Sequence, residues 1–240
     1  MTDEPLGDGT TPLYQAALRG DRDAVAALLR DRVDVNNRNR DNLWTVLMVA
    51  VAGAREDIVA LLLRHPDVDV NAQSDSGDTA LHIAADRGYD RIAGLLLAQP
   101  AIDVNRKNAK GWTALATAVL RNRLDIVRLL LAHPDLDVNL VDRDRQTALH
   151  WAVLSGHLDV LRLLLERADV NVAITNRPAN QTAREIAQAS SHLEMARLLG
   201  ERAATGQFSD TLSARDRYEP RPAEPSPPPM RPFIADPPQR

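Results

Sequence analysis

Short apolar runs recur in pairs along the first 200 or so residues, and each pair is divided by a polar break. In the clearest example, the run 80–85 is followed by a break at Arg87-Gly88 and by a second run at 92–97. The three- and four-residue spacing of the apolar positions predicts two short amphipathic helices for each pair. Two such helices cannot bury their apolar faces alone, so the pattern predicts that neighbouring pairs stack.

The helix pairs belong to a repeat that two independent motifs mark in phase. A Thr-x-Leu motif recurs every 34 residues and begins at Thr11, Thr45, Thr79, Thr113 and Thr147. An Asp-Val-Asn motif accompanies it and ends at Asn36, Asn71, Asn105, Asn139 and Asn171. Because both motifs keep one period, a repeat architecture explains the chain better than chance does.

Local chemistry supports this assignment of elements. Each motif threonine can cap the first helix of its repeat, and its hydroxyl lies within reach of a histidine in the pairs Thr79/His82 and Thr147/His150. Proline lacks the backbone N–H that a further helical turn needs, so the second helices are expected to end before Pro66, Pro100 and Pro134. The asparagines of the Asp-Val-Asn motif are expected to brace the following turn by hydrogen bonds.

The Thr-Pro/Ala-Leu-His-x-Ala-Ala motif, the second helix ending in Leu-Leu-Leu and the Asp-Val-Asn segment together resemble the ankyrin repeat. This resemblance implies an all-α fold, an ankyrin-repeat solenoid of stacked helix-turn-helix units with protruding β-turn fingers. The expected ankyrin-repeat domain covers 7–203, with repeats at about 7–39, 40–73, 74–107, 108–141 and 142–176 and a degenerate cap at 177–203. Residues 1–6 are expected to be flexible, and 204–240 to form a Pro-rich disordered tail.

The chain departs from the ankyrin pattern at several places. Arg184 replaces the usual leucine in the last repeat, which suits a terminal cap facing water. Leu43 stands where the turn glycine is expected, so the family pattern does not define the geometry of the finger of repeat two. The segment Ile174–Asn180 lengthens the last finger, and irregular stacking is expected there.

The predicted tail contains nine of the 15 prolines, between Pro220 and Pro238. Such a segment buries too little apolar surface to offset its ordering entropy, so it favours extended, disordered conformations. Its stretch 225–232 contains Pro-x-x-Pro and could dock in an aromatic groove of a domain that reads polyproline helices. Strings of this kind are also common in disordered tails, and both interpretations stay open.

Composition narrows the class of partner. The formal net charge of −4 gives no general attraction to nucleic acid or to an anionic membrane. The acidic start lacks the features of a secretory signal, and the longest apolar stretch, Val46–Ala54, is too short to cross a bilayer. We therefore expect a cytoplasmic monomer that binds neither nucleic acid nor membrane, and export routes without such a signal remain open.

Candidate catalytic and metal-binding residues were sought among the histidines and acidic residues. His82 matches His150 and His65 matches His133 at equivalent repeat positions, which indicates structural roles. The absence of cysteine excludes thiolate chemistry, and no metalloprotease, nucleophile-elbow, phosphate-loop, dinucleotide or calcium-loop motif is present. The sequence predicts no enzyme activity, no catalytic residue, no metal and no cofactor.

The resemblance implies that partners bind at the finger tips and at the exposed, concave face of the first helices. The residue before each motif threonine lies near a finger tip, and the end of each first helix adds an apolar and basic stripe. The partner-binding candidates are Arg19, Trp44, Asp78, Arg87, Trp112, Leu120, Arg121 and Leu154. Leu18 belongs to the same stripe, whereas Trp151, inside its helix-start motif, is predicted to pack in the core.

Two interpretations of these candidates remain. Trp44, Trp112, Leu120, Arg87 and Arg121 could together contact an acidic segment of a partner protein, since tryptophan is frequent at interface hot spots. Alternatively, each tryptophan packs on a neighbouring finger, and each arginine pairs with a nearby carboxylate of Asp75, Asp78 or Asp86.

The predicted function is that of a non-catalytic scaffold or adaptor that binds one or more other proteins. An inhibitor or immunity-type protein that occludes a partner enzyme would use the same surface. An exported effector that acts on host proteins would do so as well, and the sequence does not separate the three.

Overall fold

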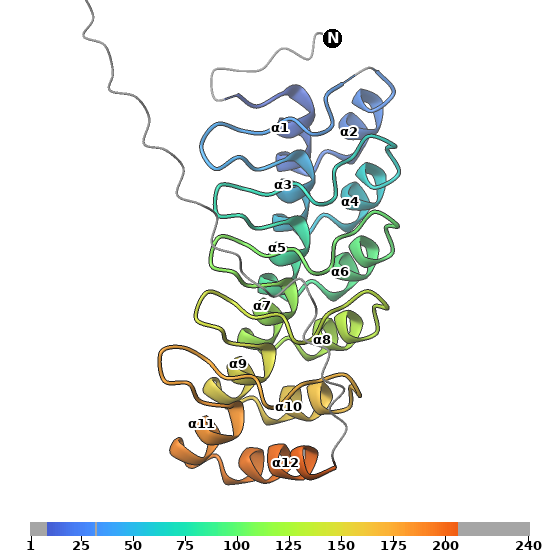
Figure 1. Ribbon diagram of the computed structural model, residues 1–240. Helices are drawn as coiled ribbons and strands as arrows, with labels where there is room; N and C mark the ends of the chain where they lie inside the picture. The colour runs from blue at the N-terminus through green and yellow to red at the C-terminus, as the bar shows by residue number, and fades with distance from the viewer. Residues whose placement is uncertain (1–8, 32, 206–240) are drawn as a thin grey trace, which may run out of the picture. The chain divides into compact units, whose positions relative to one another are not determined.

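The structure, a computed structural model, describes residues 9–31 and 33–205, and within these ranges it contains twelve helices and no β-strand (Figure 1). The first helices of the six repeats are α1 (Pro12–Arg19), α3 (Val46–Ala52), α5 (Ala80–Arg87), α7 (Ala114–Leu120), α9 (Ala148–Leu154) and α11 (Ala183–Ala189). The second helices are α2 (Arg22–Leu28), α4 (Glu56–Leu62), α6 (Asp90–Leu97), α8 (Leu124–Leu131), α10 (Leu158–Leu165) and α12 (Leu193–Ala204). The predicted all-α repeat fold is confirmed.

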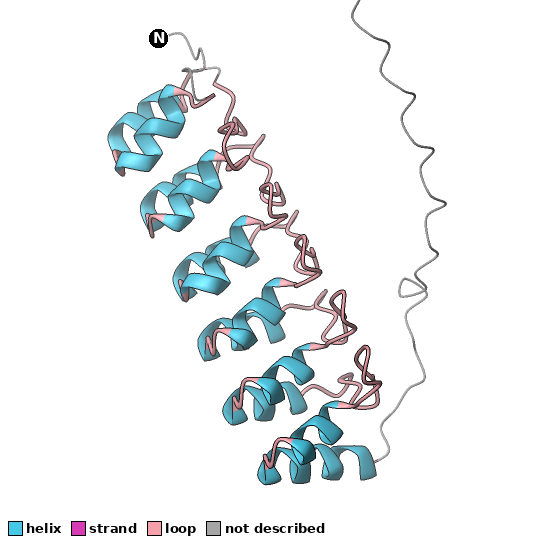
Figure 2. Ribbon diagram, turned by 90° about the vertical axis from the view of Figure 1, so that its left-hand side faces the viewer, coloured by secondary structure: helices cyan, strands magenta, loops and turns pink. Residues whose placement is uncertain are grey.

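The six helix pairs stack in chain order, and the fingers project on one side of the stack (Figure 2). Each first helix packs against its own second helix, and each of the first five also packs against the first helix of the next repeat. The leucine of each Thr-x-Leu motif lies in the resulting core, which is continuous from Leu13 to Leu199. Burial of each such side chain contributes about 1.5–3 kcal/mol, so stability comes mainly from contacts between repeats.

Every first helix begins at a threonine cap, as the sequence predicts. The caps are Thr11, Thr45, Thr79, Thr113, Thr147 and Thr182, whose side chains each accept a hydrogen bond from the backbone N–H three residues on. In α5 and α9 the histidine side chain accepts a hydrogen bond from the backbone N–H of the cap threonine, and in α11 the Glu185 carboxylate does so. The predicted threonine–histidine pairs are therefore confirmed.

The asparagines of the Asp-Val-Asn motif connect consecutive repeats, whereas the sequence predicted only that they brace the following turn. The Asn105 Nδ2 group donates to the Asp135 carbonyl oxygen at 2.7 Å, and Asn105 Oδ1 accepts from the Asp137 N–H at 2.9 Å. Equivalent pairs of bonds are made by Asn36, Asn71 and Asn139. Each amide thus satisfies backbone groups of the next repeat and fixes its register.

The residue two positions before each first-helix cap has a positive φ, whether or not it is glycine. Gly77 and Gly111, two residues before their caps, have φ values of 74° and 82°. Leu43 and Arg145 occupy the same register position with φ values of 57°, a conformation that is strained for residues other than glycine. The finger of repeat two nevertheless differs from its neighbours, because the Asn39 N–H donates to the Trp44 carbonyl oxygen five residues on, whereas Asn108 and Asp142 donate to the residue four on.

The cap repeat closes the stack as expected, with Arg184 exposed to solvent. No helix within the described ranges is both long and apolar enough to span a bilayer. Helix α12 ends at Ala204, and the predicted tail beyond residue 205 and the predicted flexible residues 1–6 lie outside the described residues.

Two glycines of repeat three test the stacking geometry as a matched pair. Gly88 has a φ of 81°, and a Cβ atom there would lie 2.9 Å from Arg123 Nε of the next repeat. We expect Gly88→Ala to lower the free energy of unfolding by more than about 1 kcal/mol. Urea denaturation followed by circular dichroism measures this change.

Gly94 lies inside α6, where a Cβ atom would meet no heavy atom within 4 Å. Gly94→Ala is therefore expected to raise the free energy of unfolding by about 0.5–1 kcal/mol. Equal effects of the two substitutions would contradict the role assigned to the Gly88 turn.

Candidate functional site

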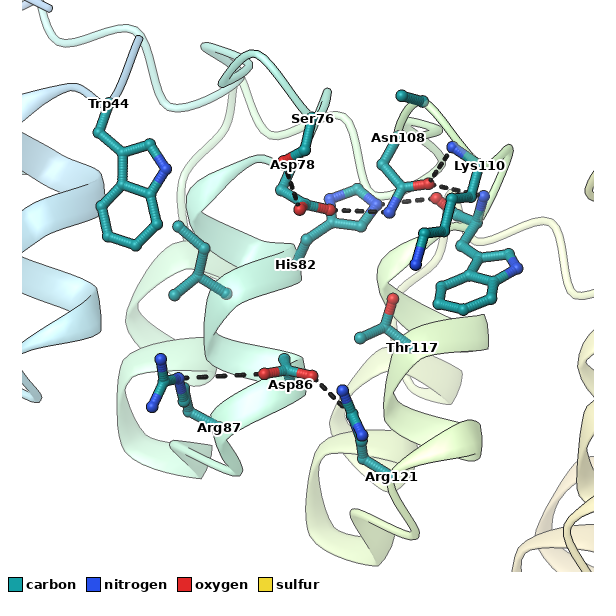
Figure 3. A pocket seen from close by; sticks show the side chains of 13 residues that line it. Trp44, Ser76, Asp78, His82, Asp86, Arg87, Asn108, Lys110, Thr117 and Arg121 are labelled. Atoms are coloured by element: carbon teal, nitrogen blue, oxygen red, sulfur yellow. Dashed lines mark hydrogen bonds and ion pairs between the residues drawn. The ribbon is translucent and has the colours of Figure 1, made fainter. Parts of the chain in front are cut away.

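A groove of about 340 Å³ opens on the surface formed by the fingers and first helices of repeats two to four (Figure 3). We call it the central groove. It is lined by Trp44, Ser76, Asp78, His82, Ile83, Asp86, Arg87, Asn108, Ala109, Lys110, Trp112, Thr117 and Arg121. Five of the eight predicted partner-binding residues are therefore brought together here: Trp44, Asp78, Arg87, Trp112 and Arg121.

A polar row borders the groove on the finger side (Figure 3). Ser76 Oγ donates to Asp78 Oδ2 at 2.8 Å, and Asn108 Nδ2 donates to Asp78 Oδ1 at 2.7 Å. Asp78 thus joins the finger of repeat three to that of repeat four, and both of its carboxylate oxygens are engaged. Its role in the free protein is to position the two fingers.

A second polar row borders the groove at the ends of α5 and α7. Arg121 Nε lies 2.6 Å from Asp86 Oδ1, and Arg87 Nε lies 3.9 Å from Asp86 Oδ2. The two arginines are thus paired with a neighbouring carboxylate, the second of the two sequence interpretations. More than half of each arginine side chain stays exposed, so these ion pairs contribute at most about 1 kcal/mol each.

The tryptophans differ from their predicted surroundings. Trp44 and Trp112 are partly buried and do not stand exposed on the tips. Trp112 lies under the Lys110 ammonium, which is 4.6 Å from its ring centroid. Its ring also meets that of Trp151 edge-on, with the centroids 5.4 Å apart.

Trp151 packs against the core as predicted, but it is only partly buried, and its Nε1 group donates to Asp142 Oδ2 at 3.0 Å. It stands four residues after its motif threonine, as the groove residues Ile83 and Thr117 do. That register was the sequence signal that would have placed Trp151 on the same surface as Trp112.

Three predicted contact residues lie outside the central groove. Arg19 and Leu154 are exposed at the ends of α1 and α9, and Leu120 is partly buried at the end of α7. Conversely, sequence reasoning missed Lys110 and Asn108, since it considered only the residue directly before each threonine. The finger turn brings both of them over the groove.

His82 lies at the base of the groove and is neutral. Its Nδ1 atom accepts from the Thr79 N–H at 3.3 Å, so the proton is on Nε2, which donates to the Trp112 carbonyl oxygen at 2.9 Å. His150 bonds in the same way to Thr147 and to the Gln181 carbonyl oxygen. Burial lowers the pKa of both rings, and the carbonyl bond and a nearby carboxylate oppose this only in part.

The groove therefore provides surface for contacts rather than side chains that are available for a chemical reaction. Its two carboxylates are engaged and its histidine is buried and neutral. Across the described ranges, no three or more acidic or histidine side chains gather in a way that could hold a metal ion.

Comparison with protein families identifies the class. The family model described as "Ankyrin repeats (3 copies)" matches residues 1–74, 61–142, 95–174 and 135–210. The chain belongs to the ankyrin repeat family. Ankyrin repeats are generally modules of protein–protein interaction. No curated protein matches the chain in sequence.

Solved structures agree with this assignment. The ankyrin repeat protein EF0377 is 26% identical, with a TM-score of 0.73 over 79% of this chain and 96% of its own. The ankyrin repeat domain of Bcl-3, described as a unique member of the IkappaB protein family, is 28% identical. Its TM-score is 0.74 over 81% of this chain and 87% of its own.

The buried histidines predict a pH dependence of stability. Because the pKa of both rings is lowered in the folded protein, the unfolded chain binds more protons below the ordinary value of 6.5. The stability that the two neutral histidines contribute is therefore present above pH 6.5 and is lost as the pH falls below this value. We expect the free energy of unfolding to drop by up to about 1.4 kcal/mol per histidine between pH 7.5 and 5.5.

Urea titrations at the two pH values measure this drop, with His82→Gln/His150→Gln as the comparison. The double variant is less stable at pH 7.5 but should lose less on acidification. The lowered pKa of Asp169, caused by its hydrogen bond with Arg167, acts below its ordinary 3.8 and thus outside this range. An equal drop in both proteins would show that other groups govern the pH dependence.

Proposed function

We propose that the chain is a non-catalytic scaffold that binds a partner protein through the central groove. The observation that carries this proposal is the placement of the tryptophans. The chain has only three, and Trp44 and Trp112 line the groove while Trp151 contacts Trp112. Tryptophan is among the most frequent hot-spot residues of protein interfaces, and its large partly buried ring gains contact area at low entropic cost.

The state of the polar groups supports binding over catalysis. A general acid or base needs a titratable group that can reach a substrate, but His82 is buried with both ring nitrogens bonded. Asp78 and Asp86 are held by neighbouring donors. These groups fix the shape of the groove, which is what a rigid recognition surface requires.

Charge supports an acidic partner segment. The groove is lined by three cationic side chains, Lys110, Arg87 and Arg121, and by two carboxylates, Asp78 and Asp86, so the lining has a formal charge of +1. The whole chain carries −4. A positive groove on a negative protein favours partners whose acidic groups are confined to the contact region.

Affinity capture with the tagged full chain, followed by calorimetry on the captured protein, tests the proposal. Trp112→Ala and Trp44→Ala should each weaken binding about 30-fold, the effect of losing a hot-spot contact. Leu129→Ala, which truncates an exposed side chain on the second helix α8, is the matched control and should bind as the wild type does. Circular dichroism confirms that all three variants are folded.

Two results would redirect the proposal. A partner that binds both tryptophan variants with unchanged affinity would contradict a role for the groove. If that partner is lost when residues 206–240 are deleted, the Pro-rich segment is the binding element.

A further inference from the structure

Lys110 differs from every other cation of the groove. Its ammonium lies over the Trp112 ring, and within the described part of the chain no carboxylate pairs with it. The chain has only two lysines, Lys107 and Lys110, and both belong to this one finger. The neighbouring arginines share Asp86, so Lys110 carries the least compensated positive charge in the groove.

The surroundings of Lys110 combine this charge with apolar surface. Ile83 and Thr117, which are buried, line the groove, and Trp44 borders it from the neighbouring repeat (Figure 3). The polar atoms of Asp78 and Asn108 at the rim bond to one another. An occupant therefore meets an apolar centre with one available cation at its finger side.

We infer that the occupant is a short peptide segment of the partner in which an acidic side chain adjoins an apolar one. The carboxylate binds Lys110, an apolar side chain beside it packs on Trp112, and the segment continues over Ile83 to Trp44 of repeat two. This inference rests on the proposed function and adds the chemistry of the segment that the groove selects.

Lys110, rather than Arg87 and Arg121, is the residue that recognises the acidic side chain of the segment. An ammonium on an aromatic face keeps donors for a carboxylate, because only part of its surface meets the ring. A carboxylate that approaches Arg87 or Arg121 instead meets Asp86, which repels it and must be displaced. Lys110 is therefore the residue that determines specificity for an acidic segment.

A random linear peptide library displayed on phage is the probe. The full chain, immobilised through a C-terminal tag that leaves its lysines unmodified, is the target, and phage that also bind Trp112→Ala are removed. We expect the remaining peptides to be enriched in Asp or Glu next to an aliphatic or aromatic residue. Their affinities are then measured with labelled synthetic peptides by fluorescence anisotropy in 0.15 M salt.

The two lysines supply a matched pair of variants. Lys107 belongs to the same finger but does not line the groove, so Lys107→Glu makes the same change of net charge outside the site. Lys110→Glu should weaken the selected peptides at least about tenfold, as loss of a desolvated charge pair does, and Lys107→Glu by about threefold or less. Lys110→Arg keeps the cation and should retain most of the affinity.

The outcomes separate this inference from the proposed function. Peptides that require Trp44 and Trp112 but show no acidic preference, or that bind Lys110→Glu as tightly as the wild type, overturn the inference and leave the groove as a binding site. If no peptide remains after the phage that bind Trp112→Ala are removed, both the inference and the groove's role in peptide binding are overturned.

Discussion

The structure depends on burial between neighbouring repeats, because no helix pair can cover its own apolar faces. Leu81 and Ile92 are buried only because the helices before and after them in the stack complete the core. Such a fold tolerates change at any surface position that does not enter the contact between repeats. Stability and recognition are therefore carried by different residues of the same short helices.

Polar groups set the register in which the repeats stack. The Asn71 and Asn105 amides each bridge to backbone groups of the following repeat, and His82 reaches the Trp112 carbonyl oxygen. Hydrogen bonds to fixed backbone positions are directional, whereas apolar contacts are not. These bonds therefore hold Trp112 and its finger at a defined place beside the α5 helix.

The fold could be predicted almost completely from the sequence, since it follows from a period and from residues whose local chemistry is fixed. Thr79 predicts a cap wherever it precedes a helix, whatever its neighbours are. The finger with Leu43 shows where this fails, because a residue other than glycine has a positive φ there and the turn is one residue longer than that of repeat four. Its Asn42 carbonyl oxygen accepts a hydrogen bond from the Asp75 N–H of the next finger, a contact that a local motif does not reveal.

The candidate site could be predicted only in part. Register alone placed Trp44, Trp112, Arg87 and Arg121 on one surface, but the partners of each side chain come from other repeats. Asp86 was considered among the carboxylates that could pair with the arginines, but its contact with both of them depends on the distance between α5 and α7. The position of Lys110 over Trp112 likewise depends on the path of the turn between them.

The electrostatic arrangement also limits which partners the groove can accept. Charges separated by more than about 8 Å are largely screened at physiological salt, so the positive lining acts only on groups that enter the groove. A uniformly acidic protein would meet the net negative charge of the whole chain before it reached Lys110. A short acidic segment on an otherwise neutral or basic surface avoids this repulsion and still supplies the carboxylate. Selectivity in this stack thus comes from the contrast between the local charge of one finger and the net charge of the whole chain.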